Sequence, residues 1–253
     1  MNRRDFNQAL AAVGLASALN PLNVRAQAQK LKIGVILPRS GYLGFIGQSC
    51  QKGADLAPGV IKDMLGVDIE LMNADFESNV DTARNRAERL IQEGANVLVG
   101  PFDSGAAAAI AQVAEQRGVP FVINIAAAPQ ITEQGYKYVF RNFQTAGDIV
   151  RNGLDLIGEL FQATNTVPRT AVYMHVNDTF GQAMTKGIEA LLPRRTQLPF
   201  KIVDTISYDP AAKDLTVEVS KAKAANADFL LLVCRLNDAI ILRREMVKQR
   251  WNP

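Results

Sequence analysis

Residues 31–37 have the sequence LKIGVIL, and Pro38 ends this apolar run. A short, almost continuous apolar run predicts a β-strand that is buried on both faces, as strands are in parallel sheets. Similar runs occur at 97–99, 121–123 and 229–233, and amphipathic segments of helical length separate them. Strands that alternate with helices indicate βαβ units. The sequence therefore predicts an α/β protein with parallel sheets.

The order of elements predicts two lobes. We expect strands near 31–37, 68–72, 96–99, 121–123, 138–141, 171–175, 200–206 and 229–233, and helices near 48–65, 81–92, 105–117, 148–161, 181–192, 215–225 and 237–249. The pattern restarts around residues 141–147. This predicts two doubly wound, Rossmann-like lobes, at 29–144 and 145–253, with a cleft between them. The crossing at 141–147 is expected to supply part of a hinge.

The N-terminal segment has the layout of an export signal. Arg3 and Arg4 precede a mild apolar stretch at 9–19, and Ala26–Ala28 supplies small residues at the spacing of a cleavage site. A paired arginine before a short apolar run predicts a twin-arginine signal peptide at 1–28, and hence a periplasmic protein. The apolar stretch is too short to span a bilayer core of about 30 Å. An ordinary amphipathic helix is the alternative.

Composition excludes several classes of protein. The net charge of +3 includes the arginines of the leader, so the remaining chain is near neutral and nothing indicates a nucleic-acid partner. Cys50 and Cys234 are the only thiols and could pair in an oxidising compartment, although two free thiols are the preferred interpretation. With His175 as the only histidine, a zinc site of the usual composition cannot form. We expect no cofactor and no metal.

Motifs for catalysis are missing as well. The chain has no G-x-G-x-x-G after the first strand, no phosphate-binding loop of the G-x-x-x-x-G-K-[ST] type and no G-x-S-x-G elbow. A Ser/His pair would need His175, which lies inside a predicted strand, where a structural role is favoured. The sequence predicts a protein that is not an enzyme.

Three loops at the expected carboxyl ends of strands have the chemistry of a binding site. The first, 38–47, is rich in glycine and includes Tyr42 and Ile46. The second, 100–105, includes Phe102 and Ser104. We expect Ser104 to cap the following helix, where free N–H groups would hold an anion. The third, 125–129, has small residues that let the backbone approach a ligand. Each loop alone is explained by an ordinary βα turn.

Together the motifs become recognisable. They are KIGV at 32–35 with Ser40-Gly41, NAD at 73–75, VLVGP at 97–101, AAAP at 126–129 and DTFG at 178–181. In this order and spacing the chain resembles the type I periplasmic solute-binding proteins of ABC importers, in the Leu/Ile/Val-binding branch, over residues 30–253. The resemblance implies a monomeric receptor whose lobes close on a small solute and deliver it to an ABC permease in the inner membrane.

The resemblance also implies which residues bind the solute. Ser104 and the loop at Ala126–Ala127 stand where family members hold a carboxylate or an ammonium. The family's Tyr-Gly pair falls at Phe180-Gly181, a common hydroxyl residue falls at Ala127, and an aromatic position falls at about Ile46. These departures weaken the case for an α-amino acid.

Arg235 follows the apolar run at 229–233 and Cys234, at an expected carboxyl end. A guanidinium there could clamp a carboxylate through two hydrogen bonds, or it could be a surface charge. The ligand is then a small carboxylate, either a branched-chain amino acid or an aromatic or aliphatic acid. The candidate site comprises Tyr42, Ile46, Phe102, Ser104, Ala126, Ala127, Phe180 and Arg235.

Two other functions remain open: a ligand-sensing module of a receptor, and a periplasmic enzyme on a flavodoxin-like fold. The chain ends at Trp251-Asn252-Pro253, directly after a predicted helix, where a turn would normally lead into another strand. Members of the resembled family continue well beyond this point. We therefore expect a chain that is truncated at its C-terminus, with both lobes incomplete.

Overall fold

The computed structural model describes residues 30–253, so the leader expected at 1–28, with Arg3 and Arg4, lies outside the described residues. Residues 31–253 form one compact unit. Within it the strands belong to two separate sheets, one in the first half of the chain and one in the second.

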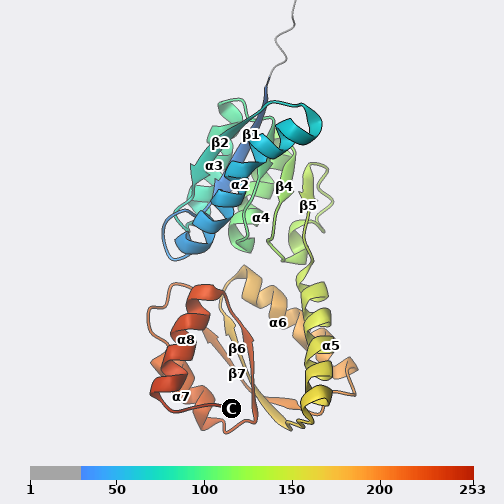
Figure 1. Cartoon of the computed structure of the whole chain (residues 1–253), viewed down its shortest axis with the longest axis vertical. Coiled ribbons are helices and arrows are strands. Elements are labelled where there is room, and N and C mark those ends of the chain that lie inside the picture. Colours follow the sequence, from blue (N-terminus) through green and yellow to red (C-terminus); the bar gives the residue numbers. More distant parts are fainter. Residues whose placement is uncertain (1–29) are drawn as a thin grey trace, which may run out of the picture. The chain divides into compact units, whose positions relative to one another are not determined.

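The first sheet has five strands in the order β2-β1-β3-β4-β5. They are β1 (Leu31–Leu37), β2 (Ile69–Asp75), β3 (Val97–Val99), β4 (Phe121–Ile123) and β5 (Val139–Arg141). All four pairs are parallel, with Leu31 opposite Ile69 and Ile33 opposite Val97. Strand β1 can be followed beside β2 in Figure 1.

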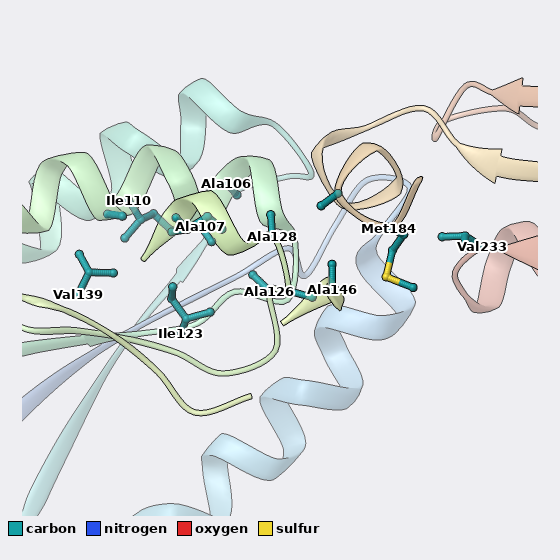
Figure 2. Packing of buried hydrophobic residues seen from close by; sticks show 14 of the residues in the cluster. Ala106, Ala107, Ile110, Ile123, Ala126, Ala128, Val139, Ala146, Met184 and Val233 are labelled. Carbon is teal, nitrogen blue, oxygen red and sulfur yellow. The ribbon is translucent and has the colours of Figure 1, made fainter. Parts of the chain in front are cut away.

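Three helices connect these strands: α2 (Gly44–Leu65), α3 (Val80–Gln92) and α4 (Ser104–Arg117). Asn79 caps α3 by accepting a hydrogen bond from the Thr82 N–H, and Gly118 ends α4 in the left-handed conformation. The apolar side chains of α3 and α4 join the main core of the protein. Small buried side chains of this core come from α4, the loop after β4 and the start of α5 (Ala146–Thr164), including Ala106, Ala126, Ala128 and Ala146 (Figure 2).

The second sheet has three parallel strands in the order β7-β6-β8. They are β6 (Thr170–Val176), β7 (Lys201–Tyr208) and β8 (Phe229–Val233). The helices of this half are α5, α6 (Thr179–Leu191), α7 (Thr216–Ala224) and α8 (Leu236–Lys248). Short 3₁₀ turns lie at Pro129–Ile131 and Leu192–Arg194.

Helices cover both faces of the second sheet, as alternate residues of β6 demonstrate. Ala171 and Tyr173 pack into the core that includes α5 and α6, whereas Val172 and Met174 pack with α7 and α8. Consecutive side chains of a strand point to opposite faces, so the two helix pairs lie on opposite sides. Figure 1 shows α5 and α8 on either side of β6 and β7. The doubly wound arrangement predicted from the sequence is confirmed.

Strand bounds agree closely with the prediction at 31–37, 121–123 and 229–233. The first helix was expected to begin at Gln48, but α2 begins at Gly44. Glycine weakens a helix, so the glycine-rich segment was assigned to a loop. The reason for glycine here is space: a Cβ on Gly47 would lie 1.9 Å from the Pro38 carbonyl oxygen. Because α2 begins at Gly44, Ile46 lies in the first turn of this helix.

Across residues 30–253, none of the helices combines the length and the apolar character needed to cross a bilayer.

Candidate functional site

Two pockets lie where strands of both sheets end. The smaller one encloses about 310 Å³ and the larger one about 590 Å³. Ile46 and Arg235 line both pockets, so they form the wall between them. Ligands of open α/β sheets bind at the carboxyl ends of the strands, which makes these pockets the candidate site.

The smaller pocket is apolar. Its lining comprises Ile46, Phe102, Ile125, Ala127, Phe143, Ile149, Phe180, Cys234, Arg235 and Leu236. Three phenylalanines come from different elements: Phe102 follows β3, Phe143 follows β5, and Phe180 lies in the first turn of α6. Arg235 is the one charged residue in this lining. The volume is near the lower limit of typical ligand pockets, about 300–1,000 Å³, so the pocket suits a small molecule with an apolar body.

The larger pocket is more polar and is lined by residues of the loop after β1, the loop after β7 and the start of α8. They are Gly41, Tyr42, Leu43, Ile46, Pro210, Ala211, Ala212, Lys213, Arg235, Asn237, Asp238 and Ile241. The Asn237 side-chain N–H donates to the Tyr42 carbonyl oxygen at 3.0 Å. This hydrogen bond joins the second half of the chain to the loop after β1.

Arg235 is held between two carboxylates. It stands directly before α8, and its Nη1 lies 2.6 Å from Asp178 Oδ2, while its Nη2 lies 3.5 Å from Asp103 Oδ2. The guanidinium carbon is also 5.1 Å from the centre of the Phe180 ring, in the range of a cation–π contact. Only 9% of the side chain is exposed. Arg235 is therefore not a solvated surface charge.

The same two aspartates cap helices that face each other from the two halves of the chain. Asp103 Oδ1 accepts from the Ala106 N–H at 2.7 Å at the start of α4, and Asp178 Oδ1 accepts from the Gly181 N–H at 2.9 Å at the start of α6. Each carboxylate thus uses one oxygen for a helix and the other for Arg235. The helix N-termini carry partial positive charge, which attracts both carboxylates.

Asp103 corrects the expectation that Ser104 caps α4. Asp103 has extended backbone angles and a side chain that reaches the third N–H of the helix, so it takes the capping position, and Ser104 becomes the first helical residue. The Ser104 hydroxyl instead accepts from the Ala128 N–H at 3.3 Å. It ties the start of α4 to the small-residue loop after β4.

Burial and charge act in opposite directions in this cluster. Burial raises the pKa of Asp103, with a further contribution from Asp178, although the Ala106 N–H and Arg235 oppose the shift. For Arg235, burial lowers the pKa, but Asp178, Asp103 and Asp238 together outweigh it and raise the pKa above its ordinary value. The guanidinium is therefore charged at neutral pH.

The structure brings six of the eight predicted site residues to the pockets. Tyr42 lines the larger pocket; Phe102, Ala127 and Phe180 line the smaller one; Ile46 and Arg235 line both. Ser104 and Ala126 are fully buried behind the lining. The Ala126 carbonyl accepts from Arg141, whose other terminal nitrogen donates to the Ala128 carbonyl at 2.7 Å, so Arg141 braces this loop.

Sequence reasoning missed Asp103, Asp178, Phe143 and Asn237. A signal existed for the aspartates, because each stands directly before an expected helix, which is the preferred position of a capping carboxylate. Phe143 had no such signal, since it lies in the segment interpreted only as a crossing between the lobes.

The remaining candidate groups are the two cysteines and the histidine. Cys50 and Cys234 are both free thiols. Burial, helped by Asp238, raises the pKa of Cys234 to about 11. His175 is buried in β6 and stacks on the Tyr173 ring with centroids 5.2 Å apart. Within the part of the chain that the structure describes, no cluster of three His, Cys, Asp or Glu residues could hold a metal ion.

Known proteins resemble this chain over most of its length. The Leu/Ile/Val-binding protein homolog 7 of Brucella abortus is 26% identical over 234 residues, which is 88% of this chain and 57% of that protein. Among solved structures, the leucine-binding protein LivK of Thermotoga maritima has a TM-score of 0.74 and 22% identity, over 88% of this chain and 61% of LivK. A solute-binding protein of an ABC transporter from Rhodopseudomonas palustris, solved with benzoate, has a TM-score of 0.73 and 24% identity, over 87% and 58% of the two chains.

The chain thus spans less than two thirds of each of these relatives. A family model described as periplasmic binding protein matches residues 30–245. This match covers most of the chain and agrees with the two parallel sheets and the cleft at their carboxyl ends. The chain therefore belongs to the periplasmic binding protein family and has the type I fold of that family's Leu/Ile/Val-binding members.

Proposed function

We propose that this protein is a periplasmic solute receptor that binds a small carboxylate with an apolar or aromatic body. The observation that carries the proposal is the apolar pocket with three phenylalanines and a single charged lining residue, Arg235. An apolar body would leave water for this pocket, at a gain of roughly 25 cal/mol per Å² of apolar area removed from water.

Arg235 has donors left for the acid group. A guanidinium carries five N–H groups, and the contacts with Asp103 and Asp178 use one on each terminal nitrogen. The two aspartates fix the plane of the guanidinium, so little side-chain entropy remains to be lost on binding. The Phe180 ring lies against the guanidinium and the pocket at once, which suits a flat ligand stacked beside it.

Binding is proposed to close the two halves of the chain on the solute. The hydrogen bond from Asn237 to Tyr42 and the contact between Arg235 and Asp103 already link the two halves, and they are the contacts that an open form would break. The segment at 141–147 is the proposed hinge. The receptor, exported by the twin-arginine leader at 1–28, would act as a monomer, perform no bond chemistry and deliver the solute to an ABC permease.

A ligand screen tests this proposal. The full chain is titrated with benzoate, 4-hydroxybenzoate, 3-phenylpropanoate, 4-methylpentanoate and leucine, with sodium sulfate as the ionic control. We expect at least one organic acid to raise the melting temperature in proportion to its concentration, because a ligand stabilises only the folded state. Calorimetry then gives the affinity. Recovery of the acid unchanged would support a receptor, whereas turnover would contradict it.

Two phenylalanines make a matched control. Phe143 and Phe140 are exposed to a similar degree, at 45% and 53%, but Phe143 lines the apolar pocket, whereas Phe140, on β5, lies outside both pockets. We expect Phe143→Ala to weaken binding about tenfold, since losing part of a ring contact costs on the order of 1.4 kcal/mol. Phe140→Ala is expected to leave the affinity unchanged. Equal affinities of the two variants would remove the apolar pocket from the proposal.

A further inference from the structure

We propose that Arg235, clamped between Asp103 and Asp178, selects against ligands with an ammonium group, so that the receptor takes acids without an α-amino group. This inference rests on the proposed function. It adds a rule of specificity: the protein's own guanidinium occupies the place where a ligand cation would otherwise meet the carboxylates of the cleft.

The first argument is that both carboxylates of the clamp already contact Arg235 and a helix N–H, and that neither aspartate is among the residues that line the two pockets. Asp103 Oδ1 is taken by the Ala106 N–H and its Oδ2 by Arg235. Asp178 repeats this arrangement with the Gly181 N–H and Arg235. An ammonium needs an oxygen to replace its lost water, and a buried cation without such a partner is strongly disfavoured.

The second argument concerns the other charged groups around the cleft. The apolar pocket has no carboxylate among its described lining residues, and its one charge is positive. Asp238 lines the larger pocket, but its Oδ2 accepts from the Tyr208 hydroxyl at 2.9 Å and from the Arg235 backbone N–H at 3.0 Å. Lys213, in the same lining, adds a second positive charge.

The third argument is the match of hydrogen-bond donors and acceptors. Asp103 and Asp178 offset the charge of Arg235, but neither aspartate lines the apolar pocket, so a ligand there meets the guanidinium directly. Guanidinium and ammonium groups only donate hydrogen bonds, whereas a carboxylate accepts them. The two groups of an α-amino acid lie one carbon apart, so an amino acid with its carboxylate on Arg235 leaves its ammonium without an acceptor. The acid that lacks the amino group keeps the hydrogen bonds to Arg235 without this cost.

Matched ligand pairs test the rule on the full chain. Leucine and 4-methylpentanoate share one carbon skeleton, as do phenylalanine and 3-phenylpropanoate. We expect the amine-free acid of a pair to bind at least about tenfold more tightly, and Arg235→Lys to keep this order because the charge remains. An amino acid that binds as tightly as its partner overturns the inference while leaving the receptor function intact.

A second experiment does not depend on the solute. Arg235→Ala vacates the volume of the guanidinium and removes the ion pairs of both aspartates. We expect methylguanidinium chloride, about 10 mM, to raise its melting temperature above the value in equal sodium chloride, and to leave the wild type unchanged. Arg243→Ala, an exposed position on the same helix α8, is the matched control and is expected to show no rescue.

The two experiments separate the possible failures. If no acid or amino acid binds the wild type, the proposed function fails, and rescue of Arg235→Ala still shows a cation-accepting site that Arg235 fills. Absence of rescue, with a cooperative melt of the variant, shows that the carboxylates do not attract a cation and overturns the inference. If Arg235→Ala does not fold, the ligand order of the wild type and Arg235→Lys decides.

Discussion

Replacing Gly181 with alanine is predicted to destabilise the protein strongly. A Cβ at this position would lie 1.7 Å from the Val176 carbonyl oxygen and 2.9 Å from the Val176 carbonyl carbon. Both atoms belong to the backbone of β6, which has neighbours on both sides and cannot move aside. The first turn of α6 must therefore shift by more than an ångström, which would also lengthen the capping hydrogen bond from the Gly181 N–H to Asp178.

The magnitude follows from the nature of the clash. Overpacking typically costs about 1–3 kcal/mol, and a clash with fixed backbone belongs at the upper end of that range. For a chain of this size each kcal/mol changes the melting temperature by roughly 2–4 °C, so we expect a decrease of about 6–12 °C.

Thermal unfolding followed by circular dichroism at 222 nm measures the change, and Gly153→Ala is the matched control. Gly153 lies inside α5, and no atom stands within 4 Å of its would-be Cβ, so alanine there is expected to stabilise the helix by roughly 0.5–1 kcal/mol. The reasoning would be refuted by a Gly181→Ala protein that melts at or above the wild-type temperature while Gly153→Ala behaves as expected.

Three further predictions concern titrating groups. Hydrogen bonds from Thr145 and then Arg151 lower the pKa of Asp148 to about 2. The stability that this carboxylate contributes is present above its unfolded pKa of about 3.9 and is lost as the pH falls toward 2. In Asp148→Asn the free energy of unfolding should therefore fall less between about pH 3.9 and about pH 2 than in the wild type. Burial raises the pKa of Asp103. The stability that it contributes is present below about pH 3.9 and is lost as the pH rises through the folded pKa. Urea melts at a series of pH values should show this fall in unfolding free energy in the wild type but not in Asp103→Asn, and an unchanged fall in the variant would contradict the assignment. Because the pKa of Cys234 is about 11, its thiolate fraction at pH 8 is roughly a hundredfold below that of an ordinary thiol. Iodoacetamide should therefore label Cys234 slowly in the folded protein and rapidly in 8 M urea. Equal labelling rates in the two conditions would refute its burial.

Much of the fold was predictable because burial on both faces leaves a clear pattern. The strands at 121–123 and 229–233 are apolar throughout, and the strand at 31–37 is apolar apart from Lys32 and Gly34, as expected of strands in sheets that are covered on both sides. The start of α2 was not predictable from propensity, because Gly44 and Gly47 disfavour a helix in isolation. Only the position of the Pro38 carbonyl in the folded chain explains why Gly47 is required.

The site was predictable in outline but not in its pairings. The rule that ligands bind at the carboxyl ends of strands predicted Tyr42, Ile46, Phe102 and Arg235, and the family resemblance predicted Phe180; all five line the pockets. Asp103 and Ser104 are adjacent and both suit an N-cap, and the backbone angles decide between them only in the folded chain. Asp103 lies far from Arg235 in the sequence, so no local pattern could indicate that they form an ion pair.

The parallel pairing of every strand in residues 30–253 has a consequence for how fast the chain folds. None of these pairs is a hairpin, because the paired residues are far apart in the sequence: Leu31 pairs with Ile69, Ile33 with Val97, and Ala171 with Phe229. Each pairing requires the closure of a long loop, and the chain loses conformational entropy before the hydrogen bonds between the strands can form. This entropy loss slows folding. During that delay the apolar edge of β8 is unpaired and can join another chain. We therefore expect refolding yield to fall with protein concentration more steeply than the stability of the folded protein would indicate.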